Sequence, residues 1–221
     1  MHAQIVLFDG FDPLDVIAPY EVLYAGGLLS GGAVGVELVS AEGPREVPSG
    51  TPAVSLRATA ALTPGQADLV LVPGALGRVT EGDGETAEHP EHVSAVLGRA
   101  LATPLPGLLR QAMDHPQVTV ATVCGGSLLL AMAGLLHGRY ATTHHAAAEA
   151  LGAAGAHAVP ARVVDDGDLV TGAGVTSGLD LGLYLLERGT GPRIAHAVEE
   201  LFAHERRGTV WRPQGPAPLT L

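Results

Sequence analysis

Short apolar runs recur along the chain, and glycine, proline or acidic residues separate them. Runs of roughly four to eight residues that are rich in valine and leucine are typical of buried strands. We predict such strands over residues 3–8, 34–40, 67–72 and 118–123. Longer apolar segments predict helices over 14–25, 105–113 and 128–136, and a final helix from 177 that breaks at 189–192. Strands alternating with helices predict an α/β fold, a three-layer, doubly wound, mostly parallel sheet with helices on both faces.

The helix predicted over 14–25 carries end signals in the sequence. Asp12 suits the N-cap position, and Pro13 suits the first helical position. The pair at 26–27, two glycines, predicts the stop of this helix. Nearer the C-terminus, apolar runs flank the acidic turn at 165–168 and predict a hairpin.

The length of 221 residues and the even composition indicate one domain, which we place at residues 1–208. Residues 209–221 form a Pro- and Gly-rich tail, expected to be loosely ordered from Pro213 onward. The chain is 47% hydrophobic but only 4% aromatic, so we expect a large core built from alanine, valine and leucine.

Charge and cysteine content narrow the function classes. The net charge is −11, and the 12 basic residues are spread along the chain, which argues against a nucleic-acid partner. A single cysteine excludes an intramolecular disulfide and fits a reducing compartment. No signal peptide and no apolar run of about 18 residues is evident, so we expect a cytoplasmic protein without a membrane partner.

The stretch around Cys124 carries the most specific chemical signal. A predicted strand ends at residue 123, Cys124 follows, and Gly125 and Gly126 lead into a predicted helix. This is the layout of a nucleophile elbow, and the positive end of the helix is expected to favour the thiolate. The alternative is a small buried hydrophobic residue, which is the commoner role of a lone cysteine.

Two other predicted strand ends belong to the same edge of the sheet, where α/β folds bind ligands. Asp15 follows the first strand, and Gly74 and Ala75 follow the third. A carboxyl group beside a thiol could exchange a proton with it, and backbone N–H groups of Gly74, Ala75 and Gly125 could stabilise a developing negative charge. Asp15 could instead only stabilise the start of its helix.

His89 and His92 are three residues apart in an acidic stretch. Helical spacing could place both on one side and form a metal site. A solvated acidic face is the favoured interpretation, so we expect neither a metal nor a cofactor.

Considered together, the motifs of this chain resemble the ThiJ/PfpI superfamily, the cysteine branch of the flavodoxin-like, class I glutamine-amidotransferase-like fold. The matching segments are VLFDG (6–10), LDVIAPYEVL (14–23), LVPG (71–74), VCGGS (123–127), AGLLHG (133–138), ATTH (141–144) and TGAGVTSGLD (171–180). They occur in order over most of the chain. Isonitrile hydratase-like members and the sensor halves of some AraC-type regulators are the most similar branches.

The resemblance implies roles for particular residues. Cys124 would be the nucleophile, Asp15 the acid that hydrogen-bonds it, and His144, with Thr143 beside it, would lie near the pocket. In the hydratases the thiolate attacks the terminal carbon of an isonitrile, and water then yields an N-formamide. The family also implies a small-molecule substrate and a homodimer with the pocket near its interface.

Two departures from the family pattern leave the activity open. Hydratases usually have threonine after the cysteine, and protease- and glyoxalase-like members have histidine, where this chain has Gly125. Residues 78–104 also look longer than the family's usual segment and are expected to be an insertion. The leading hypothesis is an isonitrile hydratase-like lyase. The alternatives are a redox- or ligand-sensing, stress-response protein with an oxidisable cysteine and, third, a glyoxalase or deglycase.

Overall fold

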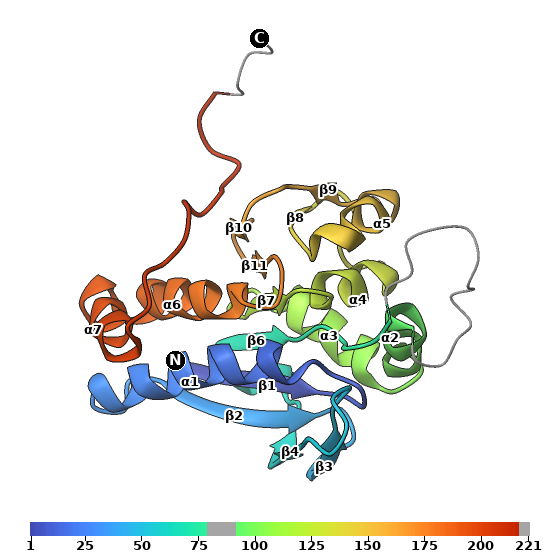
Figure 1. Ribbon diagram of the computed structural model, residues 1–221, viewed down its shortest axis with the longest axis horizontal. Helices are drawn as coiled ribbons and strands as arrows, with labels where there is room; N and C mark the ends of the chain where they lie inside the picture. The colour runs from blue at the N-terminus through green and yellow to red at the C-terminus, as the bar shows by residue number, and fades with distance from the viewer. Residues whose placement is uncertain (79–91, 217–221) are drawn as a thin grey trace.

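A computed structural model describes residues 1–78 and 92–216 (Figure 1). Its main sheet has seven strands in the described residues, in the order β10-β11-β7-β6-β1-β2-β5. Their bounds are β1 His2–Leu7, β2 Gly35–Ser40, β5 Ala60–Ala61, β6 Leu69–Val72, β7 Thr119–Val123, β10 Val163–Asp165 and β11 Leu169–Gly172. All neighbours are parallel except β10 and β11, which form the predicted hairpin.

Helices cover both faces of this sheet. The chain moves from β1 to β2 in one direction along the sheet and from β6 to β7 in the other. Right-handed crossovers therefore place α1 on one face and α2 and α3 on the opposite face. The helices are α1 Pro13–Leu29, α2 Val93–Leu101, α3 Leu105–Asp114, α4 Gly126–Met132, α5 Ala148–Ala153, α6 Ser177–Thr190 and α7 Pro192–Phe202. Helix α6 packs against both α1 and α7, so the predicted three-layer α/β fold is confirmed.

Smaller elements decorate the ends of the sheet. They are the antiparallel pair β3 Arg45–Pro48 and β4 Ser55–Ala58, the parallel pair β8 Tyr140–Ala141 and β9 His157–Ala158, and the 3-10 turns η1 Pro64–Gln66 and η2 His145–Ala147. The core lies between the sheet and its helices and is made mainly of valine, leucine and alanine, with few aromatic side chains such as Phe11.

Two predicted helix boundaries were wrong, and one helix was missed. Helix α1 continues through Gly26 and Gly27 to Leu29. These glycines serve close packing, because a Cβ on Gly26 would lie 2.5 Å from Leu186 Cδ1 and one on Gly27 would lie 2.4 Å from the Val34 carbonyl oxygen. Helix α4 covers residues 126–132, not 128–136. Helix α2 was not predicted and lies within the expected insertion at 78–104, whose residues 79–91 are outside the described part of the chain.

The segment predicted as a tail bonds the edge of the sheet before it projects away from the body (Figure 1). The Trp211 N–H donates to the Val163 carbonyl at 3.0 Å, and the Asp165 N–H donates to the Trp211 carbonyl at 2.9 Å. Arg212 then donates to Asp165 and to the Tyr184 hydroxyl. Order therefore extends to residue 212, close to the expected limit at Pro213.

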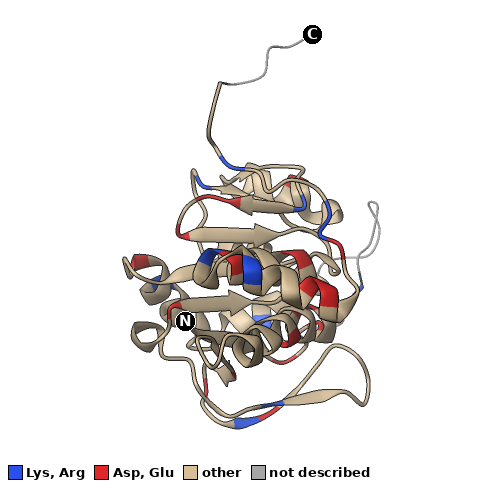
Figure 2. Cartoon of the chain, turned by 90° about the vertical axis from the view of Figure 1, so that its left-hand side faces the viewer, with Lys and Arg blue, Asp and Glu red and all other residues tan. Residues whose placement is uncertain are grey.

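Charges are scattered over the surface. Figure 2 shows arginines interspersed with acidic residues on the face that it presents. Among the described helices, none combines the length and the hydrophobicity that crossing a bilayer requires.

Candidate active site

Cys124 forms the sharp turn between β7 and α4. Its φ of 53° lies in the left-handed region, which only two other non-glycine residues of the described chain adopt, Ala53 and Ala203. Two hydrogen bonds hold the turn: the Cys124 N–H donates to the Gly172 carbonyl at 3.1 Å, and the Thr143 hydroxyl donates to the Cys124 carbonyl at 2.8 Å. A non-glycine residue kept in this conformation indicates a functional constraint.

The glycines after Cys124 bring this turn against the end of β6. A Cβ on Gly126 would lie 2.2 Å from the Val72 carbonyl oxygen, a backbone atom that cannot move easily. Gly125 is different, because its Cβ would meet Gly74 Cα at 3.4 Å and Ala75 N at 3.7 Å, which are ordinary contacts. Position 126 therefore requires glycine, whereas position 125 has room for a side chain.

Asp15 is fully buried, and its carboxyl lies next to Gly74. The hydrogen bond to Cys124 that the resemblance implied is not formed, because Asp15 Oδ1 has no hydrogen-bond partner and Oδ2 accepts from Gly74. Asp12 caps α1, its Oδ1 accepting from the Leu14 N–H at 3.0 Å, and the helix then directs Asp15 inward from its first turn. The Gly74 N–H donates to Asp15 Oδ2 at 2.9 Å. Burial and then the negative charge of Asp12 raise the pKa of Asp15, the Gly74 hydrogen bond lowers it, and the net result is a shift from 3.8 to about 8. Asp15 is therefore largely protonated at neutral pH.

The expected low-pKa thiolate is not what the structure shows. Burial, followed by the charge of Asp15, raises the pKa of the Cys124 thiol from 9.0 to about 12, while the Gly125 N–H lowers it and Asp12 raises it. Cys124 is only 8% exposed, and the desolvation of the charged form outweighs the helix N-terminus that the sequence suggested. The site at neutral pH therefore holds a neutral thiol above a protonated acid.

Cys124 opens into a cavity of about 330 Å³. Its lining residues are mostly apolar and come from the strand ends, α2, α4, η2 and α5. They are Asp12, Ala75, Leu76, Gly77, His92, Val93, Ser94, Cys124, Gly125, Leu128, His144, Ala146, Ala147, Ala150 and Val175. The structure thus brings Cys124, Ala75, Gly125 and His144 together, as the sequence had suggested.

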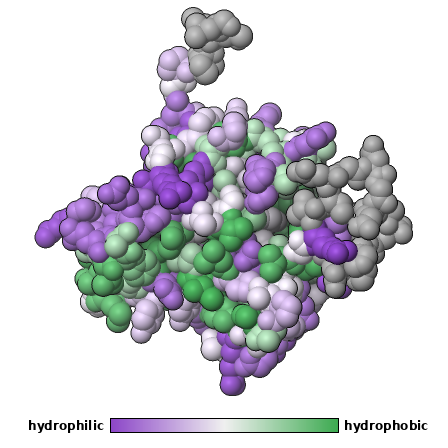
Figure 3. All heavy atoms as spheres, viewed as in Figure 1, coloured by the Kyte–Doolittle hydropathy of each residue, from purple (hydrophilic) through white to green (hydrophobic). Residues whose placement is uncertain are grey.

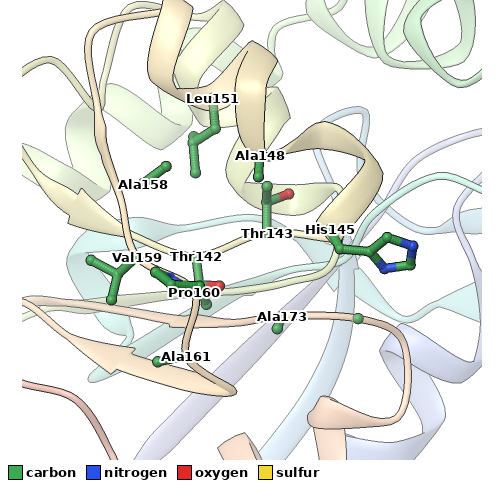
Figure 4. Close-up of a pocket in the computed structure, with 11 residues that line it drawn as sticks. Thr142, Thr143, His145, Ala148, Leu151, Ala158, Val159, Pro160, Ala161 and Ala173 are labelled. Carbon is green, nitrogen blue, oxygen red and sulfur yellow. The ribbon is translucent and has the colours of Figure 1, made fainter.

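Gly74 and Thr143 support the site without lining this cavity. The Gly74 N–H is directed to Asp15 and so serves the acid, and Ala75 and Gly125 are the predicted backbone groups that line the cavity. Thr143 holds the Cys124 carbonyl and lines a neighbouring cavity of about 440 Å³. Figure 4 shows that cavity, with Ala148 and Leu151 of α5 facing Thr142 and Ala173 and with His145 at its edge.

His144 has a lowered pKa, because burial and the neighbouring His145 both oppose its charging. Its Nδ1 accepts from the Ala146 N–H at 3.2 Å, which leaves Nε2 as the protonated nitrogen of the neutral ring.

Asp12 was recognised from the sequence only as a helix cap. It is 8% exposed, lines the cavity beside Cys124 and influences both ionisable groups of the site. The signal that could have found it is its position after the first strand, the same reasoning that selected Asp15.

Within the described ranges, no three His, Cys, Asp or Glu side chains are grouped as metal ligands. His92 lines the cavity, and its Nδ1 lies 2.6 Å from the Ser94 hydroxyl, whereas His89 is outside the described residues.

Comparisons with known proteins agree with the motifs. The DJ-1/PfpI family model matches residues 99–188. Isonitrile hydratase of Pseudomonas putida is 48% identical over 80 residues, which cover 36% of this chain and 35% of that protein. The HTH-type transcriptional regulator CdhR of Pseudomonas aeruginosa is 38% identical over 110 residues, which cover 47% of this chain and 31% of the regulator. The matches therefore span about a third of each curated relative.

The solved structure of Drosophila melanogaster DJ-1beta superposes with a TM-score of 0.73 at 20% identity, over 92% of this chain and 98% of that one. Residues 99–188 thus match the DJ-1/PfpI (ThiJ/PfpI) family model, and the chain has the fold of the solved DJ-1beta structure.

Proposed function

We propose that this protein is a cysteine-dependent small-molecule enzyme that adds water to an isonitrile and releases an N-formamide. One observation carries the proposal: Gly74 lies between Gly125, which follows the elbow thiol at an apolar cavity, and a buried acid with a pKa of about 8 whose charge influences that thiol. The partial similarity to an isonitrile hydratase supports the same reaction class.

The chemistry follows from the protonation states. Cys124 sulfur adds to the terminal carbon of R–N≡C, and that carbon receives a proton from Asp15 as the thiol proton passes to the acid. The product is the thioimidate R–N=CH–S–Cys124. Water then adds to its carbon and protonates the nitrogen, giving R–NH–CH(OH)–S–Cys124. Collapse releases R–NH–CHO and restores the thiol, so every proton is accounted for.

Formation of N-formamide from an alkyl isonitrile tests the proposal directly. Cys124→Ala should abolish turnover, because no other cysteine is present. Asp15→Asn keeps an acceptor for the Gly74 N–H but cannot exchange a proton, so we expect kcat to fall by about 10²–10⁴-fold. Turnover by the unmodified protein that does not exceed the Cys124→Ala background would contradict the hydratase function.

A ligand- or redox-sensing role is the second candidate, favoured by the similarity to a transcriptional regulator. The raised pKa of Cys124 should make oxidation slow at neutral pH, since the thiolate is the reacting form. Mass spectrometry after treatment with stoichiometric peroxide distinguishes a redox sensor from a ligand sensor. Rapid gain of oxygen at Cys124 would support the redox sensor.

Glyoxalase or deglycase activity remains the third candidate. Gly125 offers no side chain to act as a base after the cysteine, so we expect poor methylglyoxal consumption. Consumption faster than isonitrile hydration would reverse this order.

We also propose a homodimer. Helix α1 exposes Leu14, Ile17, Tyr24, Leu28 and Leu29 between 36% and 68%, and Figure 3 shows hydrophobic surface where α1 faces the viewer. An apolar stripe of this kind is typical of an interface. Light scattering after size exclusion measures the mass, and a monomer at micromolar concentration would contradict the proposal.

A further inference from the structure

Asp12 places a carboxylate in the wall of the Cys124 cavity. Two hydrogen bonds fix its position: its backbone N–H donates to the Gly74 carbonyl at 2.9 Å, and its Oδ1 accepts from the Leu14 N–H. The residue is also only 8% exposed. The N-terminus of α1 also favours a negative charge at this position. The carboxylate is therefore held rigidly at the cavity rather than extended into solvent.

No lysine or arginine neutralises this charge among the described lining residues. The whole chain contains no lysine, since all 12 basic residues are arginines, and residues 79–91 include neither type. Arg78 and Arg99 line a different hollow, which shares Leu76 and Gly77 with this cavity. The cavity thus has a fixed negative charge without a fixed positive one.

Two histidines are the other ionisable side chains among the described residues of this wall, besides Cys124. His144 is kept neutral by burial and by His145, which lower its pKa. His92 pairs with the Ser94 hydroxyl at the start of α2. The rest of the wall is apolar and includes Leu76, Leu128 and Val175.

We propose that Asp12 determines the charge class of the substrate: the cavity accepts uncharged or cationic molecules with an apolar body and rejects anions. Like charges repel more strongly inside a cavity that holds little water than in bulk solvent. An anionic group next to Cys124 would also exchange its hydration shell for alanine, leucine and valine side chains. The inference rests on the proposed function only in taking Cys124 as the place where the substrate reacts.

Charged thiol reagents test the inference without any turnover. Methanethiosulfonates form a mixed disulfide with the thiolate and release methanesulfinate, and Cys124 is the only target in the chain. The test compares the rate constants with which two methanethiosulfonates modify Cys124, the cationic ethyltrimethylammonium reagent and the anionic ethylsulfonate reagent. The pH is kept well below 8, where Asp15 is protonated. The ratio of the two rate constants cancels thiolate content, and dividing it by the same ratio for 2-mercaptoethanol, an uncharged free thiol, cancels the intrinsic reactivities of the reagents.

The wild-type protein should favour the cationic reagent by about tenfold or more over the free thiol. Asp12→Asn retains a helix cap and should bring the ratio close to that of the free thiol. Asp12→Ser, also a capping residue, should do the same if the asparagine variant folds poorly. Asp114→Asn removes one negative charge from the exposed end of α3 and should leave the ratio unchanged.

An equal ratio in the wild-type protein and the Asp12 variants would overturn the inference. Labelling of the denatured chain but not of the folded protein by either reagent would overturn it as well, because the cavity would then admit neither class. If an isocyano ester and the matching isocyanocarboxylate are hydrated with equal kcat/KM, the charge selection is contradicted and the hydratase function is supported. If the labelling rates show the expected preference but no isonitrile is hydrated, the hydratase function is contradicted and the charge selection is supported.

Discussion

Asp15 couples the chemistry of the site to the stability of the fold. Its pKa is about 8 in the folded protein and near 3.8 in the unfolded chain, so the folded state retains a proton that the unfolded state has lost between these values. The stabilisation is complete below pH 3.8 and is lost as the pH rises toward 8.

The free energy of unfolding should therefore fall over this window, by up to about 1.4 kcal/mol per pH unit from this one group. Asp15→Asn should remove that contribution and make the protein more stable near pH 8. Denaturant titrations at several pH values measure both effects, with Asp114→Asn, at the exposed end of α3, as a control. An unchanged pH dependence in Asp15→Asn would show that the carboxyl has an ordinary pKa. If Asp15 is the proton donor, kcat should fall as the pH rises through about 8, the pKa of this carboxyl.

Gly125 marks the largest departure from the hydratase pattern at the site. The space around it admits a Cβ at ordinary contact distances, and its φ of −67° and ψ of −6° are accessible to any residue. Gly125→Thr should therefore fold with a change in stability below about 1 kcal/mol and should increase isonitrile turnover by supplying a hydroxyl.

Gly125→Val is the matched control, because valine has the shape of threonine without the hydroxyl. The two variants should show similar melting temperatures and different kcat. Equal activities of the two variants would mean that the hydroxyl has no role in this protein.

At the scale of elements, the junction between β7 and α4 depends on Gly126. Its contact with the Val72 carbonyl brings the elbow against the end of β6 and so sets the distance between Cys124 and Gly74. Gly126→Ala should destabilise the protein by about 1–3 kcal/mol or more, because backbone atoms must move apart.

Gly98 provides the comparison for this variant. It lies in α2, and no atom of another described residue lies within 4 Å of its would-be Cβ. Gly98→Ala should stabilise the protein by about 0.5–1 kcal/mol. Thermal and denaturant unfolding of both variants checks the contrast, and a tolerated Gly126→Ala would show that the junction can relax.

At the scale of the whole molecule, residues 209–212 secure the edge of the sheet. The ring of Trp211 lies 5.0 Å from that of Tyr140, and Arg212 reaches the buried pair of Asp165 and Tyr184. Helix α6, strand β10 and the C-terminal segment therefore meet at one cluster.

Arg212→Ala should release this segment before the body unfolds. Trp211 is the only tryptophan, so its fluorescence should shift to longer wavelength in the variant while the far-UV circular dichroism stays native. Arg193→Ala changes an exposed arginine on α7 and should leave the emission unchanged. Unaltered emission in Arg212→Ala would show that the backbone bonds of Trp211 suffice to hold it.

The sequence by itself determined the strands β1, β2, β6 and β7, the α/β class and the elbow at Cys124, because these depend on local hydrophobic periodicity and turn chemistry. It also selected Asp15, Ala75 and Gly125 as neighbours, since parallel strands end at a common edge. The continuation of α1 through Gly26 and Gly27 depended on contacts with Leu186 and Val34, which are distant in sequence.

Only the tertiary structure decided the protonation states and the composition of the cavity. The pKa values of Cys124 and Asp15 rise because many segments together exclude water from them. Asp12 and the walls from α2 and α5 join the site through packing across the chain. Local patterns specify which residues carry the chemistry, whereas burial, a property of the whole fold, specifies the charge state in which they act.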